Sequence, residues 1–437
     1  IVACKFAEVL VMIFGLAAIQ SQSVPLLLGA VLFTGALSAL FGPAKFGSVP
    51  ELLRTDRLSL GNGILGLATV SAAAIGAIGG YWLYGQTKPD GMQNFWIPCT
   101  AILVTGILGR LTSLGIRPLT SAQPGLKFPK NVVADTWGQL QLLKSNRSLM
   151  RTALGIMFFW SLAALVQMNI AVYGEGLQLS AGSETVVGVL MALLVLGVGC
   201  GSVLAGIWSG GRVELGIVPL GAFGVVVCSL ALFIPPSISA ETGTAGAAFL
   251  NAPIWSCFWL FGLGASAGLF NVPLDAFLQH RSPDAVRGKI LAASNFLTFS
   301  GVLVSSGLFY VLQSVLKLSP TQTFLLTGLF SLPVLFYVLL LLPQATIRFV
   351  IWLLSNTVYR VRVKGLENIP EHGGALLVAN HVTWVDAILL LRTSSRPIRM
   401  LAYADYVSGW GRIIRWLADT MGVIPVKSND GPKALIR

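Results

Sequence analysis

Charged residues are scarce in this chain. They make up 11% of its 437 residues, whereas hydrophobic residues make up 55%; soluble globular proteins have roughly 25% charged residues. An ordinary soluble domain is therefore excluded, and a mainly α, polytopic membrane protein is predicted. The net charge of +12 falls mostly in short loops and after Pro343, with no interleaved basic and aromatic surface. This distribution is typical of lysine and arginine facing anionic lipid, and no nucleic-acid partner is expected.

Residues that would indicate metal, disulfide or ATP chemistry are also missing. Five cysteines stand singly in apolar surroundings without a C-x-x-C spacing. They are expected to be small buried residues, and no metal site or bound cofactor is predicted. No Walker A pattern is present, which excludes ATP bound to this segment as a driving force. The chain begins at Ile1, almost inside an apolar run and without Met or a signal peptide, so we expect a fragment at this end.

Apolar runs long enough to cross a bilayer, roughly 20 residues each, recur as far as Leu342. About ten transmembrane helices are predicted, at 5–20, 24–42, 61–84, 95–115, 150–173, 185–208, 215–235, 253–279, 288–316 and 321–342. Glycines at a spacing that favours close helix packing in lipid are Gly76/Gly80, Gly197/Gly201 and Gly264/Gly268.

The charges of the loops alternate along the chain. Lysine and arginine follow the second, fourth, sixth, eighth and final helices, as Arg54, Arg57, Arg117, Lys127, Lys130, Lys144, Arg147, Arg212, Arg281, Arg287, Lys289 and Arg348. The intervening loops carry little basic charge beyond Lys88 and Lys317. The positive-inside rule therefore predicts that the first set of loops and the C-terminal region are cytoplasmic.

A repeat relates two parts of the membrane region. The segment Gly42–Lys45 is followed by a basic loop and by Asn62 in a long helix; Val272–Asp275 is followed by a basic loop and by Asn295 in another. The two copies lie about 230 residues apart in the same orientation, as in transporters with parallel repeats. A basic linker with an amphipathic stretch from Val132 to Leu143 joins the two halves.

This layout resembles the major facilitator superfamily over roughly residues 1–343. The phrase Phe41-Gly42-Pro43-Ala44-Lys45-Phe46-Gly47, with Pro50-Glu51-Leu52, is similar to the lysophospholipid transporter branch of that family. The resemblance implies two six-helix halves, so the first two helices of the family are expected to be missing. The predicted boundaries are an incomplete N-terminal half at 1–116, a linker at 117–149, a C-terminal half at 150–343, an interfacial helix at 344–358 and a partial α/β domain at 359–437.

Ionisable residues within membrane segments are the candidates for a transport site. Lys45 and Asp275 occupy matching places in the repeat, each two residues after a proline. We expect them to line a cavity between the halves, where Lys45 faces a substrate phosphate and Asp275 faces an ammonium group or Lys45 itself. Alternatively, both side chains reach water at the helix ends. Further candidates for hydrogen bonds in the cavity, or for links between helices, are Gln167, Asn169, Asn271 and Asn295.

The pattern changes after Pro343. A short apolar stretch, 347–354, indicates an interfacial helix. Alternation and apolar runs then predict an α/β domain, with strands at 359–364, 375–379, 399–402 and 423–426 and helices at 384–391 and 410–420.

His381 is the most informative of the three histidines. It follows a strand-like run, and Asp386 comes five residues later, where a strand-to-helix turn can bring the carboxylate onto the imidazole. Such a contact would raise the basicity of the other ring nitrogen; the alternative is a loop histidine near a helix-capping aspartate. His280, beside Arg281, is expected at the surface, and His372 lies in a glycine-containing turn.

Asn380, His381 and Asp386 resemble the Asn-His-x-x-x-x-Asp motif of glycerolipid acyltransferases, and 363–370 and 422–427 are similar to neighbouring blocks of that family. The resemblance implies that His381, oriented by Asp386, deprotonates the free hydroxyl of a lysophospholipid. The oxygen then attacks an acyl thioester, from acyl-CoA or an acyl carrier protein, without a covalent acyl-enzyme. Side chains that could meet phosphate, an acidic carrier or lipid headgroups are Arg396, Arg399 and Lys427.

Together with the loop charges, the two resemblances imply a transporter of lysophospholipid in a bacterial inner membrane, coupled to re-acylation on the cytoplasmic face. Lysophospholipid, phospholipid and the bilayer are the expected partners. Two alternatives remain: an exporter of drugs or small solutes with an attached acyltransferase, and a membrane scaffold that does not transport.

Overall fold

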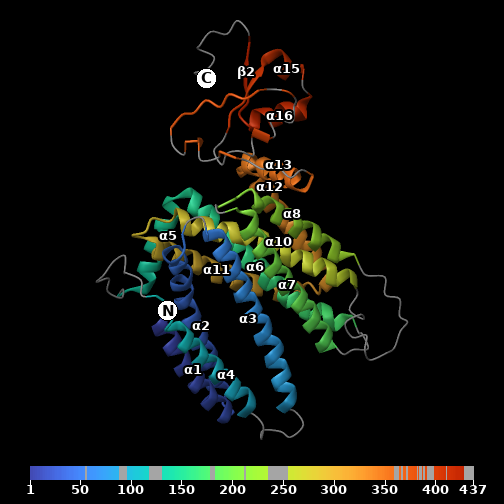
Figure 1. Cartoon of the computed structure of the whole chain (residues 1–437). Coiled ribbons are helices and arrows are strands. Elements are labelled where there is room, and N and C mark those ends of the chain that lie inside the picture. The colour runs from blue at the N-terminus through green and yellow to red at the C-terminus, as the bar shows by residue number, and fades with distance from the viewer. Residues whose placement is uncertain are drawn as a thin grey trace. The chain divides into compact units, whose positions relative to one another are not determined.

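The structure is a computed structural model, and its helices dominate the chain (Figure 1). It describes residues 1–54, 57–87, 96–117, 130–177, 183–210, 213–234, 254–358, 364–365, 368–370, 373–380, 382, 386, 389–390, 398–409 and 411–427. The chain divides into two compact units. One comprises Ile1–Val213 and Leu220–Leu335, and the other comprises Glu214–Pro219 and Phe336–Arg437.

Helices form the first unit. The N-terminal half contains α1 (Val2–Gln20), α2 (Val24–Leu52), α3 (Leu58–Thr87) and α4 (Trp96–Ser113). A linker helix, α5 (Val132–Ser145), follows. The C-terminal half contains α6 (Arg147–Gly176), α7 (Ser183–Trp208), α8 (Ile217–Phe233), α10 (Ile254–Arg281), α11 (Arg287–Tyr310, continued by a π-helical turn at Val311–Val315) and α12 (Pro320–Leu341).

All ten predicted membrane segments are helices in the described chain. Seven of these are long and apolar enough to cross a membrane, by length and composition, and α3, α4 and α8 contribute shorter apolar stretches. The amphipathic stretch of the linker is helical as well, and its start is capped because the Asn131 side chain accepts a hydrogen bond from the Ala134 amide over 3.0 Å. The prediction of a polytopic helical bundle is therefore confirmed.

The second helix is longer than predicted. We expected it to end at residue 42, but α2 continues through Pro43 and Pro50 to Leu52. In the same way α10 continues through Pro273 to Arg281. Proline removes one backbone donor and bends a helix, but in the membrane neighbouring groups can satisfy the freed carbonyl. Lys45 therefore lies inside a helix, beyond the predicted end at residue 42, and Asp275 lies inside α10, within the predicted span 253–279.

Glycines bring α7 and α10 into backbone contact. A Cβ atom added at Gly197 or Gly201 would lie 2.1 or 1.9 Å from a backbone oxygen of α10, and one added at Gly264 or Gly268 would lie 2.1 or 2.5 Å from a backbone oxygen of α7. The predicted close packing at these two pairs is confirmed. For Gly76 the added Cβ would have no neighbour within 4 Å, so this glycine makes no such contact.

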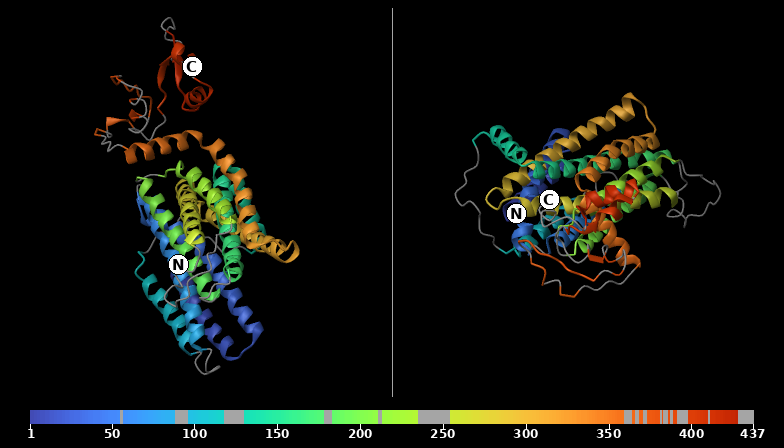
Figure 2. Two further views of the ribbon diagram at one scale, coloured as in Figure 1. Left: turned by 90° about the vertical axis from the view of Figure 1, so that its right-hand side faces the viewer. Right: turned by 90° about the horizontal axis from the view of Figure 1, so that it is seen from above.

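The two halves meet chiefly along α3 and α7, which lie side by side in Figures 1 and 2. A Cβ atom at Gly63 would lie 2.5 Å from the backbone oxygen of Ser202, and one at Gly206 would lie 3.0 Å from the Cα of Leu60. In contrast, α1, α2 and α4 pack mainly on one another within the N-terminal half. Helix α3 is therefore the main link from the N-terminal to the C-terminal half.

The cysteines are all free thiols. Cys99 and Cys228 are buried as predicted, but Cys200 on α7 is exposed, so the expectation of burial is wrong for this residue. Because the thiol is nearly apolar, its exposure on an apolar helix costs little.

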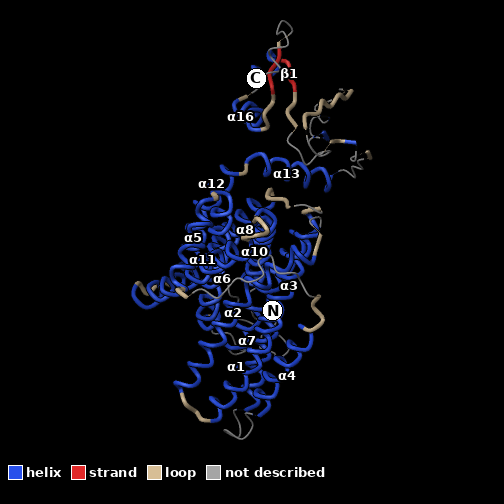
Figure 3. Tube along the Cα trace, turned by 90° about the vertical axis from the view of Figure 1, so that its left-hand side faces the viewer, coloured by secondary structure: helices blue, strands red, loops and turns tan. Residues whose placement is uncertain are grey.

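The second unit contains the predicted interfacial segment as α13 (Pro343–Val358), in which Phe349 and Trp352 stack with ring centroids 5.6 Å apart. Strands β1 (Leu401–Tyr403) and β2 (Ile424–Val426) pair in parallel, and α15 (Ala404–Gly409) and α16 (Arg412–Thr420) lie between them in sequence (Figure 3). The parallel pair and α16 agree with the predicted α/β pattern.

One predicted strand is absent from this unit. Residues 375–379 are described without strand structure, and the side chains of Leu376 and Val378 are 81% and 87% exposed. The prediction of a buried strand is therefore wrong here. A strand needs a hydrogen-bonded neighbour, and the one sheet of the described residues contains only β1 and β2. The strand predicted at 359–364 lies outside the described residues except for Lys364.

Candidate functional site

A cavity of about 270 Å³ lies within the helical unit, between its two halves. Its walls come from α2 and α3 of the N-terminal half and from α6, α10 and α11 of the C-terminal half. Polar lining residues are Ser38, Lys45, Thr69, Asp275, Gln279, Ser294, Asn295 and Thr298. Aromatic lining residues are Phe41, Phe46, Trp160 and Phe299. The cavity therefore combines one cation and one anion with large apolar surfaces.

The cation and the anion have separate partners. Lys45 Nζ donates a hydrogen bond to Thr69 Oγ1 over 2.7 Å and lies 5.2 Å from the centroid of the Phe46 ring. Asp275 Oδ2 accepts a hydrogen bond from Asn271 Nδ2 over 2.6 Å, one turn earlier on α10. The two charges interact electrostatically across the cavity. Each is held by a neutral partner, and each retains capacity for a charged ligand.

Asn295 brings α11 against α2 at the edge of this cavity. Its Nδ2 donates to the backbone oxygen of Ala39 over 3.3 Å. A Cβ atom at Gly42 would lie 2.9 Å from the same nitrogen, so the glycine leaves the space that the amide occupies. A side chain of the C-terminal half is thus fixed on the backbone of the N-terminal half.

The other candidate residues lie away from the lining. Asn271 is buried behind Asp275, to which it donates. Asn169 is fully buried on α6, and its Nδ2 donates to the backbone oxygen of Pro320 over 2.9 Å, which links α6 to α12. Gln167 is exposed on α6. The structure thus brings Lys45 and Asp275 together and leaves Gln167 and Asn169 outside the cavity.

Sequence reasoning missed Thr69, Gln279 and Trp160 as lining residues. Gln279 follows Asp275 by four residues, and this spacing puts both on one face of α10. That periodicity was the available signal. Thr69 and Trp160 carry no comparable signal, because a threonine or tryptophan in an apolar helix is common.

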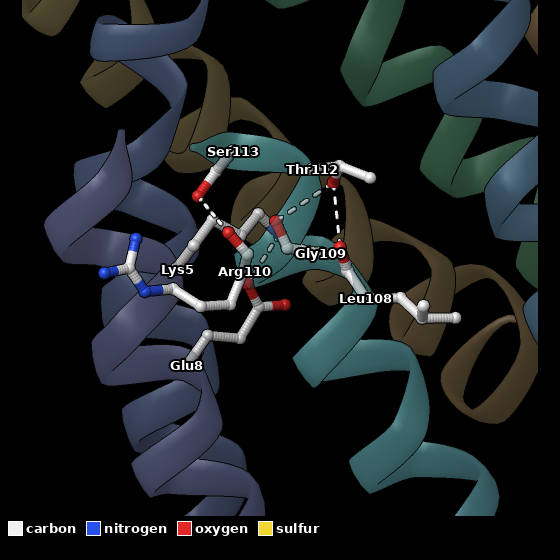
Figure 4. Close-up of polar contacts among 7 residues, drawn as sticks. All are labelled: Lys5, Glu8, Leu108, Gly109, Arg110, Thr112 and Ser113. Carbon is white, nitrogen blue, oxygen red and sulfur yellow. Dashed lines mark hydrogen bonds and ion pairs between the residues drawn. The ribbon is translucent and has the colours of Figure 1, made fainter. Parts of the chain in front are cut away.

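A second group of charges lies on α1 and α4 (Figure 4). Lys5 pairs with Glu8 over 2.5 Å, and the guanidinium carbon of Arg110 lies 6.0 Å from the centroid of the Phe6 ring. Arg110 Nη1 is buried with no hydrogen-bond partner among the described residues. None of these side chains lines the cavity.

The second unit contains part of the acyltransferase-like motif. His381 lies outside the described residues, whereas Asn380, Val382 and Asp386 lie within them. The backbone amide of Val382 donates to Asp386 Oδ2 over 2.5 Å. The carboxylate therefore folds back onto the backbone of the residue that follows His381.

The three basic candidates of this unit are only partly described. Arg396 lies outside the described residues. Arg399 precedes β1, and a Cβ atom added at Gly422 would lie 3.5 Å from its Cγ; Lys427 follows β2. Because β1 and β2 are parallel, Arg399 and Lys427 lie at opposite ends of the pair.

A described bundle of ten apolar helices, five of which enclose a cavity with a half-buried lysine and aspartate, has the architecture of a polytopic membrane transporter. Residues 6–306 match the model of the Major Facilitator Superfamily, and the chain belongs to this family. Residues 360–435 match the Acyltransferase family model. The predicted fusion of a facilitator bundle with an acyltransferase domain is thus confirmed.

Curated relatives of the bundle include three proteins described as lysophospholipid transporter LplT. The protein of Klebsiella pneumoniae subsp. pneumoniae is 23% identical over 64% of this chain and 65% of its own length. Those of Salmonella gallinarum and Yersinia pestis (strain Pestoides F) are 24% and 22% identical, over 63% and 70% of this chain and 63% and 68% of their own lengths. The chain thus spans about two thirds of these relatives.

The fold resembles the crystal structure of the Escherichia coli fucose:proton symporter FucP. The TM-score is 0.57, and the match covers 77% of this chain and 82% of the symporter at 12% sequence identity. At this identity the likeness supports the facilitator fold and carries no information on the substrate.

Proposed function

We propose that the helical unit carries a lysophospholipid across the membrane and that the acyltransferase domain restores its second acyl chain. Three relatives with lysophospholipid transporter in their names support the first step, and the Acyltransferase match at 360–435 supports the second. The two steps fit one sequence of reactions, because the product of transport is the acceptor of the acyl group.

The cavity is the single observation that carries the transport proposal. Lys45 provides a cation for the phosphate, and Asp275 on α10 provides an anion for an ammonium headgroup. The aromatic walls, Phe41, Trp160 and Phe299, would contact the acyl chain and the glycerol carbons. A cavity with both charge signs and apolar walls matches an amphiphile better than it matches a sugar or an inorganic ion.

In the acyltransferase domain, His381 acts as the general base on the free glycerol hydroxyl. Asp386 orients the imidazole, and its contact with the Val382 amide supports this role because it fixes the carboxylate beside the residue that follows His381. The hydroxyl oxygen attacks the thioester carbonyl, and the thiol of the donor leaves. Arg396, Arg399 and Lys427 provide positive charge for the lipid phosphate or for an acyl carrier protein or CoA.

The basic loops predict the orientation. By the positive-inside rule the ends of α2, α4, α7 and α10, together with the acyltransferase domain, face the cytoplasm of a bacterial inner membrane. The acylation site then lies on the side where acyl thioesters are made. The acyltransferase domain would then take its lysophospholipid substrate from the cytoplasmic leaflet.

Liposomes that contain the purified protein and labelled lysophosphatidylethanolamine test both steps. Acyl-CoA and acyl carrier protein thioester are offered in parallel as donors. We expect His381→Ala to retain transport and to lower acylation by about 10²–10⁴-fold.

Charge reversal in the cavity is the complementary experiment in the same liposome assay. Lys45→Glu and Asp275→Lys are expected to abolish transport, whereas Lys144→Glu on the exposed side of α5 is the matched control with wild-type flux. Wild-type flux in both cavity variants would contradict the proposed site. Transport of a drug or solute with no lipid flux would favour an exporter, and absence of all flux would favour a scaffold.

A further inference from the structure

Two buried amides join the halves of the bundle. Asn62 Nδ2 on α3 donates to Gln279 Oε1 on α10 over 3.0 Å, and Gln279 Nε2 donates back to Asn62 Oδ1 over 2.9 Å. The residues are 4% and 1% exposed. Each amide thus donates one hydrogen bond to the other and accepts one from it. We refer to this pair, Asn62 and Gln279, as the clasp; its two residues are 217 positions apart in the sequence.

The clasp lies where the halves are packed most closely. One residue after Asn62, Gly63 meets the backbone of Ser202 on α7, and Ser202 is itself only 2% exposed. We refer to the contact of α3 with α7 and α10 around Asn62, Gly63 and Ser202 as the inter-half seam. Because α3 begins and α7 and α10 end here, the seam closes the bundle at its cytoplasmic end in the orientation proposed above.

Gln279 belongs to the cavity as well as to the clasp. It lines the cavity, and it lies one helical turn beyond Asp275 on the same face of α10. A ligand held by Lys45 and Asp275 would have Gln279 within one turn of its polar end. The same side chain thus faces the ligand and ties the halves together.

We propose that Gln279 couples occupancy of the cavity to opening of the inter-half seam, by exchanging Asn62 for the polar end of the ligand. This inference rests on the proposed function and names the groups involved: a phosphate oxygen that accepts from Nε2 and a glycerol hydroxyl that donates to Oε1. An amide that changes one hydrogen-bonded partner for another loses little free energy, whereas an amide left unpaired in a buried seam loses much. The ligand therefore favours the opened seam, because Gln279 can bond to the ligand only after it has released Asn62.

The test measures how fast a cysteine at position 202 reacts with a membrane-impermeant maleimide. Ser202→Cys is introduced after the native cysteines are replaced, namely Cys4, Cys99, Cys200, Cys228 and Cys257. Inside-out vesicles that contain the full chain are labelled with and without lysophosphatidylethanolamine. The backgrounds are wild type, Asn62→Leu, Gln279→Met and the double variant.

In the wild-type background we expect slow labelling that lysophospholipid accelerates. Each single variant removes the partner of a buried amide, although in Gln279→Met the Asn62 Nδ2 keeps its bond to the Leu58 backbone oxygen over 3.0 Å and only Oδ1 loses its donor. Labelling without lipid is therefore expected to be faster by on the order of tenfold. The double variant replaces both amides by apolar groups of similar length, and its labelling is expected to be slow again. Lysophospholipid should accelerate neither Gln279→Met nor the double variant further, because the exchanging amide is gone.

Ser305→Ala is the matched control. Its hydroxyl donates to the Ser161 backbone oxygen over 2.6 Å, which links α11 to α6 inside one half, so its loss should leave labelling at the wild-type rate. Slow labelling in both single variants would overturn the clasp. Acceleration of the double variant by lipid would overturn the coupling through Gln279. If lipid has no effect on the labelling of wild type, the coupling fails, and lipid flux in the liposome assay decides separately whether the proposed function stands. The order of the labelling rates without lipid decides whether the clasp holds the seam closed.

Discussion

Helix α7 packs against two helices in two different ways. Against α10, in its own half, it uses Gly197 and Gly201, and the backbones approach so closely that an added Cβ would lie within about 2 Å of a carbonyl oxygen. Against α3, in the other half, the glycine contacts are looser and are accompanied by the clasp of Asn62 and Gln279 on the neighbouring helices. At its four glycines the first contact is made between backbone atoms, which have no side-chain partner to exchange.

Under the proposal above, this difference separates a contact that stays closed from one that opens. Close backbone packing has a single favourable arrangement, and it is lost as a whole when it is disturbed. Side-chain amides can satisfy their hydrogen bonds with each other, with water or with a ligand. The contact within the half therefore maintains the fold, and the contact between the halves is suited to movement.

The largest effect is expected for Gly201→Ala. The new methyl group would lie 1.9 Å from the Ala265 backbone oxygen, so the free energy of unfolding should fall by about 3 kcal/mol. Gly188→Ala on the same helix is the control, because its Cβ would have no neighbour within 4 Å. Thermal unfolding in detergent measures both, and equal melting temperatures would show that the α7–α10 contact tolerates separation.

The next effect is expected for Gly63→Ala in the inter-half seam. Its Cβ would lie 2.5 Å from the Ser202 backbone oxygen, and the halves can move apart to relieve this clash. We expect the fold to persist and the labelling of Ser202→Cys to rise about tenfold. Gly76→Ala on α3, with no neighbour within 4 Å, should label at the wild-type rate. Unfolding of Gly63→Ala to the extent seen for Gly201→Ala would erase the distinction between the two contacts.

A double-mutant cycle on the clasp gives a smaller effect. Asn62→Leu and Gln279→Met should each destabilise the closed seam, and the double variant should be less destabilised than the sum, with a coupling free energy of about 1–2 kcal/mol. The labelling rates of Ser202→Cys in wild type, the two single variants and the double variant are converted to free energies, and their differences give the coupling. Additive effects would mean that the two amides do not act on each other.

The smallest effect is expected for Asn169→Ala. This amide donates to the Pro320 backbone oxygen inside the C-terminal half, so its loss should lower the free energy of unfolding by about 1 kcal/mol. Labelling at position 202 should not change, because no contact between the halves is affected. An increase in labelling would show that contacts within the half also control the seam.

The sequence predicted the helices well because apolar length alone identifies a membrane span. It also placed Lys45 and Asp275 in equivalent positions through the repeat. It misplaced the end of α2 because Pro43 looked like a boundary, whereas in lipid a helix can continue through proline when its freed groups find partners. In the second unit, the exposed run 375–379 shows that an apolar segment is a strand only where a neighbour pairs with it.

The partners of the amides could not be predicted from one sequence. Asn62 and Gln279 are separated by 217 positions, and an asparagine in a membrane helix has many possible partners. Their identity depends on how the halves pack, which in turn depends on the glycines of α3 and α7. The spacing of Asp275 and Gln279 on one face of α10 was visible in advance, but it could not show which other helix that face would meet.

Pro43 has a consequence for how the two halves complete each other. A proline in a helix leaves the carbonyl four residues earlier without its backbone donor, and for Pro43 that carbonyl belongs to Ala39. The missing donor is replaced by Asn295 Nδ2 of the opposite half. The N-terminal half thus contains an acceptor that it cannot satisfy along its own helix, and the C-terminal half contains the group that satisfies it. Any movement that withdraws α11 from α2 must therefore return this carbonyl to water or to the headgroup of a lipid.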